Sequence, residues 1–194
     1  MTQKNKVPDF NKLAQQLKRE ARVIAGTESV KFFKDCFRKK GFTDTSFKEW
    51  PKSDSPLKGK SLMVNTTHLS DSIRKKYDTE ERIVIESEAI YSQLHNEGGT
   101  ITVTRALKAH FWKLFYEFSE GVTVKKNNAA SLSKKNVSLG KKAMYCRAIA
   151  LKPVGSKIKM PPRQFMGKSA TLMLKIDDYW RDKIDLVFKQ HLND

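Results

Sequence analysis

The chain has 194 residues, with 38 Lys and Arg against 21 Asp and Glu, so its formal net charge is +17. The length suits one domain with a sizeable core, and 11 Phe, 5 Tyr and 3 Trp exclude a chain that is disordered throughout. No apolar run approaches the ~20 residues of a membrane span, and the N-terminus has no apolar signal segment. Cys36 and Cys146, far apart, predict reduced thiols in a cytosolic product rather than a disulfide scaffold. The charge itself predicts a polyanionic partner.

The positive charge is unevenly distributed. The net charge is +8 over 1–60, −3 over 61–104, +11 over 105–159 and +1 over 160–194. Lysine accounts for 29 of the cationic residues and arginine for 9. Lysine is a mobile point charge, whereas base recognition favours the rigid fork of arginine. The pattern predicts non-specific electrostatic contacts rather than recognition of a nucleotide sequence.

The N-terminal part predicts a pair of helices. Apolar residues recur at helical spacing over 10–24 and again over 30–37, and Gly26 lies between the two runs. Gly41 is the expected end of the second helix. We expect the two helices to pack as an antiparallel pair.

The next segments predict irregular chain followed by a hairpin. Proline, glycine, serine and aspartate punctuate residues 43–65, where Trp50 is the one large anchor. A short helix or turn is expected over 68–72. Residues 73–77 and 82–87 predict two strands, because β-branched residues are frequent in the second of them.

A short helix and a further strand are expected before residue 105. Ser87 is placed to cap a helix that runs through Leu94 and ends at Gly98 and Gly99. Residues 100–104 (TITVT) have the composition of a strand.

The C-terminal half predicts a helix at each end. Residues 105–118 form a helix or apolar run, and 168–192 form the clearest amphipathic helix of the chain. Between them, 121–142 predicts a flexible tip rich in Lys, Asn and Ser, and 143–151 a returning strand. The order of elements predicts an α+β fold: an N-terminal helix pair, a small antiparallel sheet with a short helix, and a long C-terminal amphipathic helix.

Residues that could carry out catalysis are not apparent. None of the four histidines pairs with another histidine or with a cysteine at metal-site spacing, and no glycine-rich phosphate loop or serine nucleophile motif occurs. The aspartates of the last helix are expected to form a solvated face paired with its cations. They are Asp177, Asp178, Asp182 and Asp185. We therefore expect no enzyme activity, no cofactor and no metal site.

The segment 105–159 leaves two interpretations open for its aromatic and its basic residues. The aromatic residues fit base stacking, or a helix that is buried or docks onto a neighbouring subunit. They are Phe111, Trp112, Phe115, Tyr116 and Phe118. The lysine pairs fit contact with DNA or an acidic partner, or a solubilising tip. They are Lys125, Lys126, Lys134, Lys135, Lys141 and Lys142.

Three patches in order resemble one family. The first combines Trp50-Pro51 with NTTHLSDSI (65–73), which contains Leu69. The second is IYSQLHNEGG (90–99), with Tyr91, His95, Gly98 and Gly99. The third is MPPRQFMG (160–167), with Pro161, Arg163 and Phe165. Together they resemble the phage virion morphogenesis family, the tail-completion proteins of tailed phages.

The resemblance implies a structural virion protein that completes the tail and joins it to the head. It implies a homo-oligomeric ring, hexameric by the resemblance, that contacts neck and tail proteins such as the connector and the tail terminator. Non-specific contact with the phage DNA is a further expectation, and membrane contact is not expected. The expected location is the neck and tail region of the virion, assembled in the cytoplasm of the bacterial host.

The resemblance also implies how the chain is organised. Residues 1–194 would form one tail-completion-like domain, in which 105–159 is an inserted basic aromatic arm or extended hairpin. The motif residues would hold the shape of the domain, and His95 would be a structural hydrogen-bonding group. The alternative function is a non-specific nucleic-acid-binding protein that acts through its lysine-rich segments.

Overall fold

The computed structural model describes residues 9–53, 55–57, 63, 67–123 and 133–192. Its helices are α1 (Phe10–Lys39), α2 (His68–Asp71), α3 (Ser92–Glu97), α4 (Arg105–Glu120), α5 (Lys134–Ala150) and α6 (Ala170–Leu192). Its strands are β1 (Gly41–Thr43), β2 (Phe47–Glu49), β3 (Ile73–Asp78), β4 (Ile83–Ser87), β5 (Gly99–Thr102) and β6 (Lys157–Met160). The strands form three separate antiparallel pairs, β1–β2, β3–β4 and β5–β6. The predicted α+β class is confirmed.

The chain divides into two compact units. The first unit is made of three segments, Met1–Trp50, Thr66–Ser92 and Arg163–Asp194. The second unit combines Pro51–Asn65 with Gln93–Pro162. The first unit therefore closes only when segments from both ends of the chain meet.

The predicted N-terminal helix pair is wrong, because α1 is one continuous helix through Gly26. The Asp9 carboxylate caps its start by accepting from two backbone amides, and Lys40 ends it in the left-handed region at φ 58°. Gly26 lies inside the helix, on the side that packs against β3. A Cβ there would lie 3.1 Å from Cδ of Lys75 on β3, so the missing side chain lets the strand approach.

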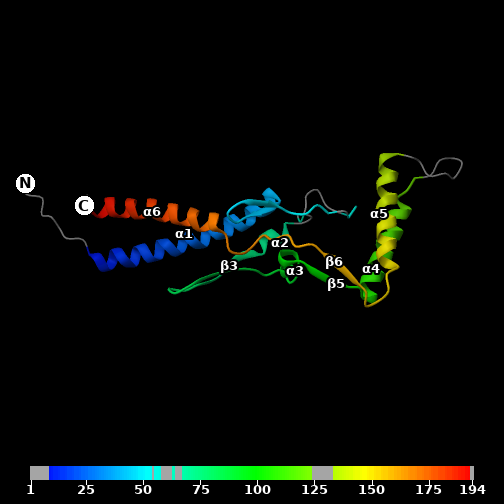
Figure 1. Cartoon of the computed structure of the whole chain (residues 1–194), viewed down its shortest axis with the longest axis horizontal. Helices are drawn as coiled ribbons and strands as arrows, with labels where there is room; N and C mark the ends of the chain where they lie inside the picture. Colours follow the sequence, from blue (N-terminus) through cyan, green and yellow to red (C-terminus); the bar gives the residue numbers. More distant parts are fainter. Residues whose placement is uncertain (1–8, 54, 58–62, 64–66, 124–132, 193–194) are drawn as a thin grey trace, which may run out of the picture. The chain divides into compact units, whose positions relative to one another are not determined.

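The antiparallel partner of α1 is α6, and the two helices lie side by side (Figure 1). Two salt bridges connect them. Lys183 Nζ is 3.5 Å from Glu20, and Lys175 Nζ is 2.8 Å from Glu28. The Glu28 carboxylate also raises the pKa of Lys175 by accepting its hydrogen bond. The long C-terminal helix was predicted, but its partner was not.

A short hairpin, β1–β2, lies in a segment predicted to be irregular. Gly41 pairs with Glu49, and a Cβ on Gly41 would lie 2.5 Å from the carbonyl oxygen of Lys48, so only glycine fits. The turn of the hairpin receives the start of α6. Asp44 Oδ1 accepts from the backbone amide of Ala170 at 2.8 Å, and the Ser169 hydroxyl donates to the carbonyl of Thr43 at 2.7 Å.

The β3–β4 hairpin is confirmed, with Ile73 opposite Ser87 and a register shift between Lys75 and Tyr77. Ser87 does not cap a helix as predicted. It is the last residue of β4, and its hydroxyl lies 2.7 Å from that of Ser72. The following helix, α3, therefore begins later than predicted, at Ser92.

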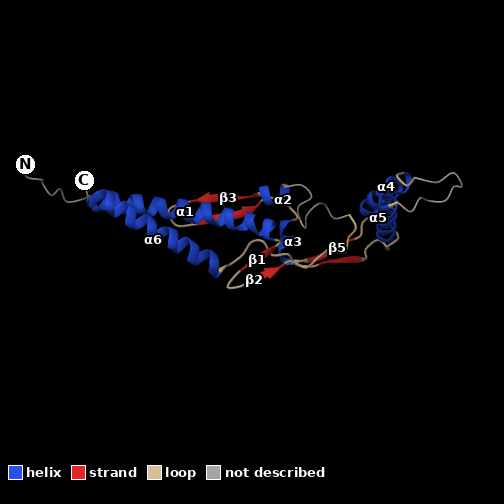
Figure 2. Cartoon of the chain, turned by 90° about the horizontal axis from the view of Figure 1, so that it is seen from above, coloured by secondary structure: helices blue, strands red, loops and turns tan. Residues whose placement is uncertain are grey.

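The second unit combines the β5–β6 pair with two helices, α4 and α5, that lie next to each other (Figure 2). The predicted strand over 143–151 is wrong, and so is the flexible tip over 134–142, because α5 is helical throughout. Its buried residues Ala143, Cys146 and Ala150 recur at helical spacing. Their small size allows close packing between helices, which offsets the weak helix propensity of this polar segment.

The connection between α4 and α5 is anchored at Asn136, a buried polar residue in the first turn of α5. Asn136 Nδ2 donates to the carbonyl of Thr123 at 2.7 Å, and Asn136 Oδ1 accepts from the Thr123 amide at 3.2 Å. Ser133 caps the same helix by accepting from the Asn136 amide. These bonds hold together the two ends of the connection, whose residues 124–132 lie outside the described part of the chain.

Candidate functional site

The first and third motif patches meet in the core of the first unit. Trp50 Nε1 donates to the backbone carbonyl of Gln164 at 2.6 Å, across 114 positions of sequence. Phe37 of α1 packs between the two patches, with ring centroids 5.4 Å from Trp50 and 5.1 Å from Phe165. Trp50 is 4% exposed and Phe165 1%. We call Phe37, Trp50 and Phe165 the aromatic cluster.

The first and second patches also meet within this unit. His68 Nδ1 lies 2.8 Å from the hydroxyl of Tyr91, and the two rings are 6.1 Å apart. Leu69, the next residue of the first patch, is buried. Tyr91 lies just before α3, which begins at Ser92, whereas His95 lies within that helix.

The second and third patches are joined in the second unit through the glycine pair. Gly98 has φ +76°, and a Cβ there would lie 2.8 Å from the backbone nitrogen of Pro162. Gly99 has φ +151° and pairs with Met160 across the β5–β6 ladder. Both glycines therefore occupy conformations that side chains rarely adopt. They turn the chain from α3 into β5.

The remaining motif residues are also inside or at the edge of the packed structure. His95 is half-buried on α3, and Pro161 is half-buried just after β6. Arg163 is 6% exposed, and burial lowers the pKa of its guanidinium. The motif residues thus supply core side chains and turns.

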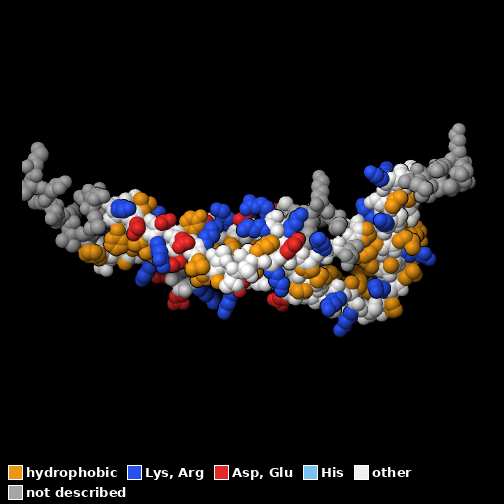
Figure 3. Space-filling model, turned by 45° about the horizontal axis from the view of Figure 1, so that its top comes forward, with side chains coloured by type: hydrophobic (Ala, Val, Ile, Leu, Met, Phe, Trp, Pro, Cys, Tyr) orange, Lys and Arg blue, Asp and Glu red, His pale blue; other side chains and the backbone are white. Residues whose placement is uncertain are grey.

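The aromatic residues predicted for contact lie together on α4, which has no fully buried residue. Phe111, Trp112 and Phe115 are half-buried, and Tyr116 is 57% exposed. The rings of Trp112 and Tyr116 are stacked with centroids 6.1 Å apart. Figure 3 shows hydrophobic side chains gathered on the visible face of the α4–α5 pair. The exposed apolar side chains of α5 and its C-cap include Val137, Met144 and Leu151.

The predicted lysines divide into two sets. Lys125 and Lys126 lie outside the described residues. On α5, Lys134, Lys135 and Lys141 are exposed, and Lys142 is half-buried with Nζ 5.5 Å from the centroid of the Phe118 ring. The described lysines therefore belong to a regular helix rather than to a flexible tip.

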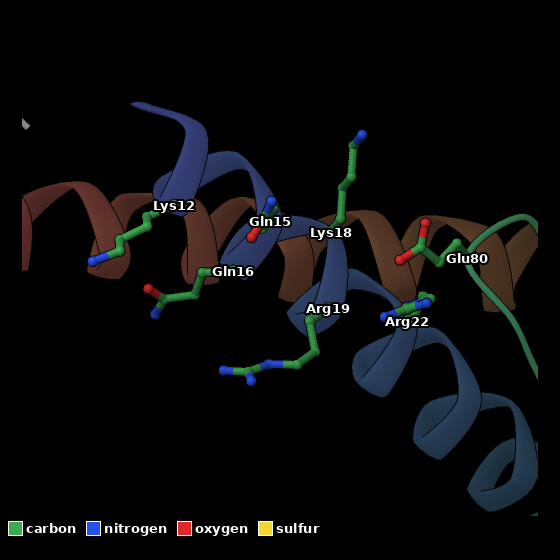
Figure 4. Close-up of a pocket in the computed structure, with 7 residues that line it drawn as sticks. All are labelled: Lys12, Gln15, Gln16, Lys18, Arg19, Arg22 and Glu80. Atoms are coloured by element: carbon green, nitrogen blue, oxygen red, sulfur yellow. The ribbon is translucent and has the colours of Figure 1, made fainter. Parts of the chain in front are cut away.

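A basic groove on α1 was not predicted as a site. It is a cavity of about 580 Å³ in the first unit. It is lined by Lys12, Gln15, Gln16, Lys18, Arg19, Arg22 and Glu80. We call it the α1 groove (Figure 4). Nothing in the sequence indicated which cations of α1 lie without a salt bridge to a described carboxylate.

Two kinds of feature are absent from the described part of the chain. There is no group of three or more His, Cys, Asp or Glu side chains there that could hold a metal ion. Nor is any described helix both long and apolar enough to cross a membrane. Burial raises the pKa of the Cys36 thiol to about 12, which suppresses its nucleophilic thiolate form.

No protein-family model, curated protein or solved structure matches the chain.

Proposed function

We propose that the protein is a structural component of a tailed-phage virion, located in the neck, where it completes the tail and joins it to the head. One observation carries the proposal: the three patches that resemble the tail-completion family contact one another pairwise. Trp50 bonds to Gln164, His68 to Tyr91, and Gly99 pairs with Met160. Patches that act together in a fold support the resemblance better than three isolated matches would.

The chemistry of these contacts supports a shape-holding role. The aromatic cluster is shielded from solvent, Gly98 is held against backbone atoms of Met160 and Pro162, and Gly99 lies against the side chain of Leu94. Side chains used in this way stabilise a scaffold and leave little free to bind a substrate. A scaffold that presents fixed surfaces to neighbouring subunits is what an assembly protein requires.

The α4–α5 pair is the surface we propose for contact between subunits of a ring. Interfaces between subunits are enriched in aromatic residues and methionine at their centres. Tyr116 is 57% exposed and Met144 60% exposed on this pair. A contact between this face and a different surface of the next subunit would close into a ring if the rotation allows.

The test of the assembly role is complementation of the encoding phage. A nonsense codon in this gene should yield separate heads and tails, and adding the purified protein to that extract should restore infectious particles. Infectious particles from the mutant without added protein would contradict the proposal.

The ring contact is tested by native mass spectrometry of the purified protein. Tyr116→Ser should shift the distribution from oligomer to monomer, because it removes an exposed ring from the proposed contact. Tyr179→Ser on α6 is the matched control, since this tyrosine is also partly exposed, at 43%. A monomer at every concentration, or equal effects of the two variants, would contradict the contact.

A further inference from the structure

We propose that the α1 groove binds the phosphate backbone of duplex DNA without regard to sequence. Its lining comprises four cationic side chains, two glutamines and one glutamate. Figure 4 shows Lys12, Gln16 and Arg19 extending from one side of α1, with Glu80 beside Arg22 at the end of the row.

The positive charge of the α1 groove arises from the way α1 pairs its carboxylates. Glu20 and Glu28 bind lysines of α6, and Asp35 lies 3.0 Å from Arg38 on its own helix. All three carboxylates within α1 are therefore paired away from the cations of its first turns, and the capping Asp9 carboxylate accepts from the backbone amides of Asn11 and Lys12.

Three cations of the α1 groove have no salt bridge to any described residue: Lys12, Lys18 and Arg19. All three side chains are exposed. The fourth, Arg22, is partly engaged, because its Nε lies 3.9 Å from Asp78. The groove thus holds three cations able to neutralise an incoming anion.

The β3–β4 hairpin closes one end of the groove. Lys75 lies against Gly26, and Asp78 lies near Arg22, so the strand follows α1 toward its N-terminus as its residue numbers rise. Glu80, in the turn after β3, ends the row. The Glu80 carboxylate disfavours an anion at this end. At the opposite end the lining residues are Lys12, Gln15 and Gln16, and the Asp9 carboxylate there is engaged in capping α1.

The dimensions and chemistry of the groove suit a regular polyanion. The stretch from Lys12 to Arg22 covers about 15 Å of helix, and a duplex carries about nine phosphate charges over that length. The lining has no aromatic side chain on which a base could stack, which argues against single strands. Its lining includes two lysines and no apolar residue, whereas the core of a protein–protein interface is apolar and depleted of lysine.

The inference is tested by the salt dependence of binding to a random-sequence duplex of about 25 base pairs, measured by fluorescence anisotropy. The groove variant carries Lys12→Gln, Lys18→Gln and Arg19→Gln. The charge-matched control carries Lys48→Gln on β2 with Lys157→Gln and Lys159→Gln on β6, three exposed lysines outside the groove. Both variants lose three positive charges, so a difference between them reports the location of binding rather than the net charge.

The slope of log K against log salt is negative. Losing three phosphate contacts should make it less steep by about 2.7. Between about 50 and 200 mM salt, the fold-loss of affinity should therefore be about 40 times smaller for the groove variant than for the unmodified protein. The control should keep the slope of the unmodified protein. Equal losses in the two variants, or an unchanged slope in the groove variant, would overturn the inference.

A third variant guards against misfolding of the groove variant. Glu80→Gln removes the one carboxylate of the groove and should tighten DNA binding, a gain that unfolding cannot produce. Unchanged or weaker binding by Glu80→Gln would count against the groove. A poly-glutamate peptide tests whether the groove binds an acidic protein rather than DNA. Binding of the peptide that depends on the groove, without binding of DNA, would overturn the inference. None of these measurements depends on the proposed assembly role.

Discussion

Replacing Phe165 with alanine tests whether the aromatic cluster stabilises the first unit. The ring is 1% exposed and lies 5.1 Å from that of Phe37, so its removal leaves a cavity between α1 and the segment that leads into α6. Truncating a buried phenylalanine costs about 3–5 kcal/mol, against a total stability of about 5–15 kcal/mol for a typical domain. We expect the free energy of unfolding of the first unit to fall by about 4 kcal/mol.

The measurement uses urea unfolding followed by tryptophan fluorescence. In a background with Trp112→Phe and Trp180→Phe, Trp50 is the only tryptophan left, and it lies inside the cluster. The signal then reports the first unit alone, which matters because a chain with two units need not unfold in one step. If Phe165→Ala does not fold, Phe165→Leu provides a milder truncation.

Phe10→Ala is the matched control, because the Phe10 side chain is 63% exposed. We expect it to change the free energy of unfolding by less than about 1 kcal/mol. A double-mutant cycle with Phe37→Leu should give a coupling of about 0.5–1.5 kcal/mol for the ring pair. If Phe165→Ala cost no more than the control, the cluster would not be the stabilising centre that its burial indicates.

Two further predictions concern the second unit and the cysteines. Asn136→Leu should destabilise the α4–α5 pair by about 1–3 kcal/mol, because the Thr123 amide and carbonyl lose their partners, and amide hydrogen exchange at Thr123 should accelerate. Protection unchanged at Thr123 would contradict this role. At about pH 8, Cys36 should react with iodoacetamide on the order of 10³-fold more slowly than an ordinary thiol, since burial raises its pKa from 9.0 to about 12. Because the folded state keeps the proton of Cys36, the contribution of this thiol to the free energy of unfolding is fully present below pH 9.0 and is lost as the pH rises toward 12. Fast labelling of Cys36 in the folded protein would contradict its burial.

Local patterns identified most of the elements but not their partners. The spacing of apolar residues predicted the beginning of α1 and the whole of α6, and β-branched residues predicted β4. Gly26 was misread as an interruption because its role depends on Lys75, which lies 49 positions further along the chain and packs against it. A glycine that admits a distant strand looks the same in sequence as one that ends a helix.

The prediction for residues 134–150 was wrong for a related reason. Its Lys, Asn, Ser and Gly residues are weak indicators of a helix, and the packing of α5 against α4 overrides them. Asn136 was hidden among similar polar residues, although it is the one whose side chain is buried and fully engaged with Thr123.

The candidate sites divided in the same way. The motif residues could be identified from their order in the sequence, and the structure adds how they contact one another. The α1 groove could not be identified, because its charge depends on where Glu20 and Glu28 find their lysines. Those partners belong to α6, more than 140 positions away in the chain.

The discontinuity of the first unit has a consequence for synthesis on the ribosome. The second unit is contiguous from Gln93 to Pro162 apart from one short segment, so its α4–α5 pair is complete before α6 is made. At about 5–20 residues per second, roughly 10–30 s separate the end of α1 from the end of α6. During that interval the face of α1 that will receive α6 is uncovered, and a nascent chain is open to capture by chaperones there. The first unit can therefore reach its final structure only after α6, the last of its described helices in the chain, has been synthesised.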